Sequence, residues 1–190
     1  MNNSNELIKD LFYFHGIEAE NEVYLAKQME GKNMIKVDVE KTNSAVETPI
    51  YQTTGSAGCD VKAYLPDGDV SIYPGQTKLI PTGLKFSIPE GFEMQIRPRS
   101  GLSLKTKLRI ANTPGTLDSD YRGELGIIME NIANPTNASR MSGSSNIVIK
   151  NGERIAQLVF APVVQAEFEL KDSLDGTERG SGGFGSTGTN

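Results

Sequence analysis

The segment from residue 110 to residue 126 carries more chemically active side chains than a turn between two strands needs. It offers an amide, two carboxylates, an aromatic ring and a guanidinium group, which belong to Asn112, Asp118, Asp120, Tyr121 and Arg122. Gly115 and Gly126 leave bare backbone near this group, and glycine lets another molecule approach the main chain closely. We therefore expect a binding site at this segment. A solvated hairpin with an ordinary type I turn at residues 118–121 is the alternative.

Residues 97–103 combine two arginines with a serine that could cap a short helix. Ser100 and the Gly-Leu-Ser-Leu-Lys that follows it would place free N–H groups and the positive end of a helix dipole beside Arg97 and Arg99. Such an arrangement binds anions. A capped turn with solvated arginines is the alternative.

The glycine-rich stretch at residues 178–188 is too flexible to fold alone. It nevertheless contains an arginine, hydroxyl groups and accessible backbone N–H groups, which are the donors that bind phosphate. Phe184 argues against a plain linker, because an aromatic ring among glycines needs a surface to cover. No Gly-Lys-Ser/Thr follows and no strand leads into the stretch, so it is not a Walker A loop.

Two further segments place polar side chains in apolar surroundings. Arg154 and Gln157 interrupt an apolar strand and need partners there, and we expect a structural role for Arg154. Asp60 begins a strand expected to be buried, after several small residues. Its neighbour Cys59 is predicted to be a small packed residue rather than a nucleophile. The single histidine, His15, has no partners nearby in sequence, which argues against a His-dependent triad.

The composition limits the classes of protein that the chain can belong to. A net charge of −5 and the lack of any Lys/Arg block argue against binding to polymer DNA or RNA. No apolar run approaches the length of a membrane span, and the acidic, polar N-terminus does not resemble a signal peptide. We therefore predict a cytoplasmic protein that uses no membrane and no intrachain disulfide, since Cys59 is the single cysteine.

Strand patterns that have to position these residues dominate the chain. The 20 glycines and 9 prolines predict many turns, which favours an all-β fold of one domain with a small appendage. A long hairpin is predicted from residues 107–110 and 125–129, with residues 110–126 elaborating its tip. The predicted strands are 34–39, 59–65, 70–73, 77–80, 84–88, 93–97, 107–111, 123–132, 145–149 and 154–162.

Two regions depart from this strand pattern. Helical periodicity is confined to residues 1–33, at residues 6–12 and 20–29 with a break at Gly16. Residues 134–144 are polar and predict a surface loop that interrupts a hairpin. The many short strands between them predict a jelly-roll-like sandwich.

Five short motifs occur together in one order: Ala-Gly-x-Asp, Pro-Arg-Ser-Gly-Leu, Gly-x-x-Asp-x-Asp-Tyr-Arg-Gly, Gly-x-Arg-Ile-Ala-Gln-Leu and Arg-Gly-x-Gly-Gly-Phe-Gly-Ser-Thr-Gly. In this order and spacing the chain closely resembles the trimeric deoxyuridine triphosphatases (dUTP pyrophosphatases). The resemblance covers about residues 34–188, and leaves out residues 1–33 and the loop 134–144.

The resemblance implies a homotrimer of distorted jelly rolls, a β-clip barrel, with active sites shared between subunits. Residues 34–170 would form the β domain and residues 1–33 a helical N-terminal extension. Residues 171–190 would form a flexible arm that closes the active site of a neighbouring subunit. The implied activity is hydrolysis of dUTP to dUMP and pyrophosphate, which limits uracil in DNA and supplies dUMP for thymidylate synthesis.

The resemblance also implies roles for individual residues. Uracil would enter the hairpin, where its contacts are the main chain and side chains of Asn112, Gly115, Thr116, Leu117 and Gly126. Tyr121 would lie beneath the deoxyribose and leave no room for a 2′-hydroxyl, and Phe184 would close over the base. The phosphate oxygens would be held by Arg99, Ser100, Gly101, Gln157, Arg179, Gly185, Ser186 and Thr187.

For catalysis, the resemblance implies that Asp118 orients or deprotonates the attacking water and also binds the 3′-hydroxyl, with Gln157 as the second catalytic residue. Mg²⁺ would be held mainly by the substrate phosphates, and Asp60 would reach it through water. Asp120 is expected to be a turn and surface residue.

Two other functions stay open at this point. A dCTP deaminase has a similar fold and hairpin, but the position that matches its catalytic glutamate is Ile128 here, with Glu130 two residues further on the same strand face. An interaction protein could instead use residues 1–33 or the loop 134–144 to bind a partner, with hydrolysis secondary.

Overall fold

The computed structural model describes residues 34–134 and 146–183 of the chain. The two predicted N-terminal helices, nearly all of the predicted loop 134–144, and Phe184, Gly185, Ser186 and Thr187 lie outside the described residues. The described elements are β1 (Asp38–Lys41), β2 (Cys59–Lys62), β3 (Val70–Ile72), β4 (Thr77–Pro81), β5 (Leu84–Ser87), β6 (Phe92–Arg97), α3 (Ser100–Lys105), β7 (Leu108–Ile110), β8 (Gly115–Leu117), β9 (Gly126–Asn131), β10 (Ile147–Ile149) and β11 (Arg154–Pro162).

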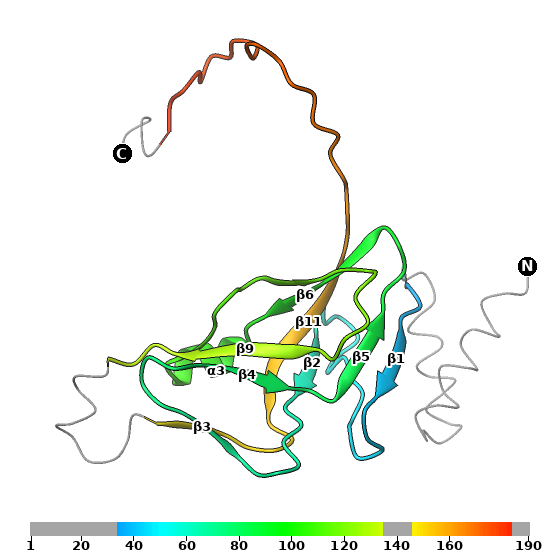
Figure 1. Cartoon of the computed structure of the whole chain (residues 1–190), viewed down its shortest axis with the longest axis vertical. Coiled ribbons are helices and arrows are strands. Elements are labelled where there is room, and N and C mark those ends of the chain that lie inside the picture. Colours follow the sequence, from blue (N-terminus) through cyan, green and yellow to red (C-terminus); the bar gives the residue numbers. More distant parts are fainter. Residues whose placement is uncertain (1–33, 135–145, 184–190) are drawn as a thin grey trace, which may run out of the picture.

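The strands form four antiparallel sheets (Figure 1). The largest has the order β2-β11-β6-β8, and a second has the order β4-β9-β7. Two-stranded sheets pair β1 with β5 and β10 with β3. The described residues therefore form a mostly β fold, as predicted, with the short helix α3 as the exception.

The core follows the alternation of apolar residues along the strands. On β9, Ile127 and Met129 are buried, whereas the residues that alternate with them, Gly126, Ile128 and Glu130, are half-buried, as a period of two requires. Side chains from several sheets reach full burial, among them Ile72, Ile80, Met94, Leu108, Ile149 and Leu158. This shared core holds the strand ends that carry the predicted site residues.

The predicted hairpin is confirmed by the pairing of β7 with β9, in which Ile110 lies opposite Met129. Its tip is more elaborate than predicted. Within it, β8 leaves the hairpin and pairs with β6, so that Gly115 lies opposite Ile96. Three residues that begin with a glycine and follow a proline give no strand signal of their own, and only the partner strand makes β8 a strand.

Three expectations about local structure were wrong. The strand predicted at residues 34–39 begins at Asp38, and all four residues of β1 are exposed, because this strand pairs with β5 at the edge of the fold. Ser100 is not the helix cap: Arg99 occupies the cap position, without a side-chain capping bond, and Ser100 is the first helical residue. The strands on either side of the loop at 134–144 form no hairpin, since β10 pairs with β3.

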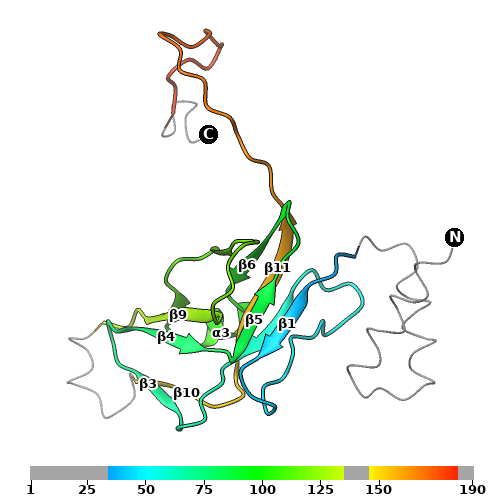
Figure 2. The ribbon, with the colours of Figure 1, turned by 45° about the vertical axis from the view of Figure 1, so that its right-hand side comes forward.

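The segment after β11 leaves the sheets. In both views it runs away from the strands (Figure 1 and Figure 2), and residues 162–181 are exposed throughout. Nothing in the described part of the chain has the helix length and apolar character needed to cross a membrane.

Candidate active site

Within the hairpin tip, residues 110–126, the loop at residues 118–125 is braced by bonds within itself. The Tyr121 N–H donates to the Asp118 carbonyl at 3.3 Å, closing the predicted turn. Nη1 of Arg122 donates to the carbonyls of Ser119 and Tyr121, at 2.6 and 2.9 Å. The Tyr121 hydroxyl donates to the Glu124 carbonyl at 3.2 Å. These bonds fix the loop while the Asp118 side chain stays exposed and free to meet a ligand.

Bare backbone at Gly115 lies directly beneath a predicted substrate-binding side chain. A Cβ added at Gly115 would lie 3.0 Å from Nδ2 of Asn112 and 3.4 Å from Cβ of Ile96. Gly115 and Leu117 are buried, whereas Asn112 and Thr116 are exposed. The tip therefore offers its amide and its main chain together, as binding of a nucleobase edge would require.

Gly126, at the other arm of the hairpin, has a neighbour that the sequence did not reveal. A Cβ at Gly126 would lie 2.6 Å from Cδ1 of Leu79, whose residue is 67% exposed on β4. The pairing of Pro81 with Gly126 brings the two together. An exposed leucine over a glycine adds an apolar wall beside the predicted base site, and only the register of β4 against β9 could have indicated it.

A second group of predicted residues surrounds Asp60. Nε of Arg99 lies 2.9 Å from Oδ1 of Asp60, and Nη1 of Arg154 lies 3.1 Å from Oδ2. Nη1 of Arg99 also donates to the Arg154 carbonyl at 3.0 Å. The Asp60 side chain is 14% exposed, so these are partly desolvated ion pairs rather than surface pairs. The expectation that Arg154 needs a partner is thereby explained.

Gln157 joins this group through the sheet. It pairs with Asp60 on one side of β11 and with Arg97 on the other. Its Nε2 donates to the Pro98 carbonyl at 2.9 Å, and a Cβ added at Gly58 would lie 2.8 Å from its Oε1. The carboxamide therefore has one orientation, which depends on the bare α-carbon of Gly58.

Strand β6 links the two groups. Ile96 pairs with Gly115 and the next residue, Arg97, pairs with Gln157, so the hairpin tip and the Asp60 group lie on opposite sides of one strand. In this sheet β8 is two strand spacings from β11, about 10 Å, and three from β2, which carries Asp60, about 14 Å. Beyond β6, Ser100 and Gly101 lie exposed at the start of α3, where the first N–H groups have no acceptor within the helix.

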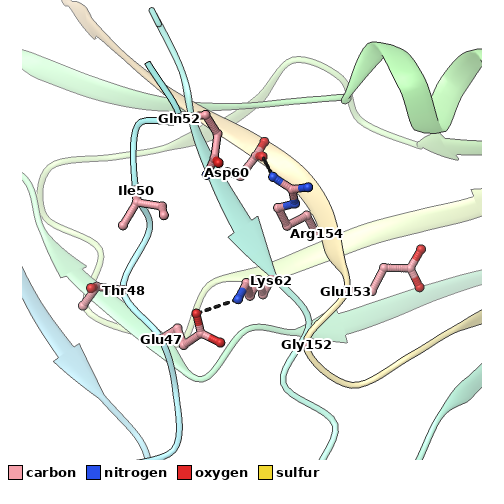
Figure 3. Close-up of a pocket in the computed structure, with 9 residues that line it drawn as sticks. All are labelled: Glu47, Thr48, Ile50, Gln52, Asp60, Lys62, Gly152, Glu153 and Arg154. Atoms are coloured by element: carbon pink, nitrogen blue, oxygen red, sulfur yellow. Dashed lines mark hydrogen bonds and ion pairs between the residues drawn. The ribbon is translucent and has the colours of Figure 1, made fainter. Parts of the chain in front are cut away.

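A polar cavity of about 470 Å³ opens beside the Asp60 group (Figure 3). Asp60 and Arg154 face each other at one end, and Lys62 bonds Glu47 across the other. Its lining residues are Glu47, Thr48, Ile50, Gln52, Asp60, Lys62, Gly152, Glu153 and Arg154. The cavity mixes both signs of charge, as a site for a hydrated ion or a polar ligand does.

The residues around Asp60 fit Mg²⁺ only as an ion shared with a ligand. Within the described ranges no three His, Cys, Asp or Glu side chains gather closely enough to hold a metal. Each oxygen of Asp60 bonds one arginine, which leaves a lone pair on each for a metal-bound water. Mg²⁺ usually keeps several waters and takes one or two carboxylates together with substrate phosphates. The resemblance implied the same donors, with Mg²⁺ held mainly by the substrate phosphates and reached by Asp60 through water.

Cys59, next to Asp60 on β2, is a packed residue. It is 5% exposed, and burial raises the pKa of its thiol to about 11. Its Sγ contacts the Leu158 carbonyl at 3.7 Å. A thiol held neutral in the core is a poor nucleophile, in agreement with the expectation from sequence.

Of the residues predicted for the C-terminal segment, the structure describes Arg179 alone, and this residue is exposed. Nε of Arg179 donates to the carbonyl of Gly182 at 2.8 Å, three residues further along the segment. Phe184, Gly185, Ser186 and Thr187 lie outside the described residues. Arg179 is thus exposed on the C-terminal segment, whereas Arg99, Ser100, Gly101 and Gln157 lie in or next to the described strands and helix.

Comparison with solved structures defines the fold class first. The chain superposes on a variant of the dUTPase of Staphylococcus bacteriophage 80alpha with dUpNHpp, with a TM-score of 0.71 and 28% identity over 82% of this chain and 100% of that one. A dUTPase variant from phage phi11 of S. aureus, which reveals the coordination of a structural Mg(II) ion, gives a TM-score of 0.64 at 26% identity over 73% and 98%. The fold is that of the dUTPases.

Sequence comparison then gives the family. The dUTPase family model matches residues 44–188. The Deoxyuridine 5'-triphosphate nucleotidohydrolase of Roseobacter denitrificans is 53% identical over 146 residues, which cover 77% of this chain and 90% of that protein. The chain belongs to the dUTPase family, and the resemblance read from the five motifs is confirmed.

Proposed function

We propose that this chain is a dUTP diphosphatase, which hydrolyses dUTP to dUMP and pyrophosphate. The relative from Roseobacter denitrificans is named for this activity, and the phage 80alpha enzyme was solved with a dUTP analogue. The observation that carries the proposal is the braced hairpin tip, in which Asp118 is exposed beside Tyr121 and the bare backbone of Gly115 lies under Asn112.

Uracil recognition is proposed to occur at the hairpin. Main-chain groups at Gly115, Thr116, Leu117 and Gly126 would bond the edge of the base, and the amide of Asn112 would complete the set. A buried donor–acceptor pattern built for uracil leaves polar groups unpaired with cytosine, which discriminates strongly. The exposed Leu79 over Gly126 would then shield one side of the base from water.

Asp118 is proposed to be the general base. Its side chain is exposed in a loop whose main chain is fixed by the Arg122 bonds, so that it can hold a water in line with the α-phosphorus. Bonding to the 3′-hydroxyl would keep the nucleotide in register with this water. Gln157, fixed by Pro98, would hold an α-phosphate oxygen.

The phosphates are proposed to lie between the Asp60 group and the start of α3. Arg99, Ser100 and Gly101 would bond phosphate oxygens, and Asp60 keeps the Arg99 guanidinium aimed at this place. Mg²⁺, when bound by the phosphates and by water next to Asp60, neutralises the charge that develops during phosphoryl transfer.

The complete site is proposed to form in a homotrimer, with Arg179, Phe184, Gly185, Ser186 and Thr187 supplied by a neighbouring chain. The segment after β11 supports this idea. It carries four apolar side chains that are at least 89% exposed in the single chain, Val164, Phe168, Leu170 and Leu174. Apolar side chains in such a row need a surface to cover, and a second copy of the chain is a surface always present at equal concentration.

Pyrophosphate release from dUTP, UTP, dCTP and dTTP tests the activity, with ammonia release from dCTP measured in parallel. We expect fast release from dUTP alone, no ammonia, and loss of activity with EDTA that Mg²⁺ restores. Light scattering on the same sample should give three times the mass of one chain. Ammonia release from dCTP would instead favour a deaminase, and full activity at the mass of one chain would exclude the shared site.

A further inference from the structure

Gly123 has no side chain, and the space that a side chain would occupy is filled by Tyr121. A Cβ added at Gly123 would lie 2.2 Å from the hydroxyl oxygen of Tyr121, 2.5 Å from Cζ and 3.1 Å from Cε1. Carbon atoms in contact lie about 3.5–4.0 Å apart, so the ring and any side chain at Gly123 exclude each other.

The backbone gives no other reason for glycine at this position. The glycines with positive φ in the described residues include Gly83 and Gly91, and Gly123 is not among them. An L-residue could adopt the backbone of Gly123 without strain. Gly91 is the opposite case, with φ of +83° and open space around it. Glycine at 123 is therefore explained by the ring above it.

The ring is partly exposed to solvent. Tyr121 is 45% exposed, and its hydroxyl makes one bond, of 3.2 Å to the Glu124 carbonyl. A side chain at Gly123 would push the ring away from that carbonyl into solvent at little cost to the fold. The direction of the ring thus depends on the missing Cβ.

We propose that Gly123 is a positioning residue that sets the sugar selectivity of the enzyme by seating the Tyr121 ring. The proposal rests on the proposed function, in which Tyr121 lies beneath the deoxyribose and excludes a 2′-hydroxyl. A displaced ring opens that space, so that ribose and deoxyribose are treated more alike. Gly123 itself touches neither substrate nor metal in this scheme.

The test compares kcat/KM for dUTP and UTP in the wild type, Gly123→Ala, Tyr121→Ala and the double variant. Gly55→Ala is the matched control, because Gly55 also lacks positive φ but has nothing within 4 Å of its added Cβ. We expect Gly123→Ala to lower the dUTP/UTP ratio at least tenfold, since one steric group is worth about 10–200-fold in selectivity. In the Tyr121→Ala background the same substitution should have no effect on the ratio.

A crystal structure of Gly123→Ala supplies a readout that does not depend on activity. The ring should be rotated away and the bond from its hydroxyl to the Glu124 carbonyl broken. A ring in its original place, or an unchanged ratio in Gly123→Ala when Tyr121→Ala lowers it, would overturn the proposal and leave the proposed function intact. An equal loss in both backgrounds would also overturn it. A wild type that does not prefer dUTP over UTP would refute the proposed function instead.

Discussion

The hairpin tip and the C-terminal segment both carry predicted substrate-binding residues, but they are built in different ways. In the tip, Arg122 and Tyr121 bond carbonyls of the same loop, and β8 joins the tip to the central sheet through β6. In the segment after β11, Arg179 bonds only within its own turn, and residues 162–181 are exposed. Within the described residues, the tip is supported by its own loop and sheet, whereas the segment is exposed.

The difference indicates how the work of the site is divided. A preformed tip fixes Asp118 before substrate arrives, which favours catalysis because little ordering remains to be done. If the exposed segment closes over a neighbouring active site as proposed, part of its binding energy is spent on ordering it. Substitutions in the tip should therefore alter turnover, and changes in the segment should alter binding.

Asp118→Asn should produce the largest effect. Removing a general base lowers turnover by about 10²–10⁴, and the exposed position of Asp118 means that the protein should stay folded. Single-turnover release of pyrophosphate measures the step directly. Asp120→Asn is the matched control, because Asp120 is a second exposed carboxylate of the same loop without an assigned role. Near-normal turnover in Asp118→Asn would show that Asp118 is not the general base and that turnover does not depend on the tip.

Deletion of residues 178–190 should produce the next largest effect, and one of another kind. Each hydrogen bond to a charged phosphate is worth about 1.5–3 kcal/mol, but ordering the exposed segment offsets much of their sum, so the loss of this stretch should lower kcat/KM for dUTP by about 10²-fold, mainly through KM. The thermal unfolding midpoint should not change, because the described residues of this stretch are largely exposed. Unchanged kinetics would refute a role for the segment.

Most of the fold could be predicted from the sequence, because alternating apolar residues and Pro/Gly turns report local preferences directly. The hairpin predicted from residues 107–110 and 125–129 is one example, although its register differs, since residues 108–110 pair with residues 129–131. What could not be predicted depends on partners distant in sequence. β8 exists as a strand only beside β6, and β1 is an exposed edge strand although residues 34–39 alternate.

The candidate site also has a part that the sequence predicted and a part that it did not. Motif order identified the polar residues around Asp60 and the hairpin, because their chemistry is visible in their residue types. The neighbours that hold these side chains in place could not be recognised from the sequence. Contacts of Gly58 with Gln157, of Gly123 with Tyr121 and of Gly126 with Leu79 depend on tertiary distances that spacing does not encode.

Gly58→Ala should have a moderate effect on activity, and it tests a residue of the Asp60 group. The new methyl would lie 2.8 Å from Oε1 of Gln157, so the carboxamide has to turn away from the phosphate site. Loss of one bond to phosphate should lower kcat/KM about tenfold. Steady-state kinetics and thermal unfolding, with Gly55→Ala as control, separate a displaced Gln157 from a weakened fold. Equal unfolding midpoints and equal kinetics would show that the close approach of Gln157 to Gly58 is required neither for activity nor for stability.

Arg122→Ala should produce the smallest effect and tests what makes the tip different from the segment. Nη1 of Arg122 bonds two carbonyls of the loop, but the residue is exposed, so each bond is worth about 1 kcal/mol or less. The loop should loosen, which raises amide exchange at residues 118–125 and lowers turnover about threefold to tenfold, without a change in KM for dUTP. Arg122→Lys should restore part of the turnover, because both bonds come from the single nitrogen Nη1 and an ammonium group also carries several donors on one nitrogen. If Arg122→Ala raises KM and leaves exchange at the tip unchanged, then Arg122 acts on substrate as the segment does, and the tip is not a self-supporting element.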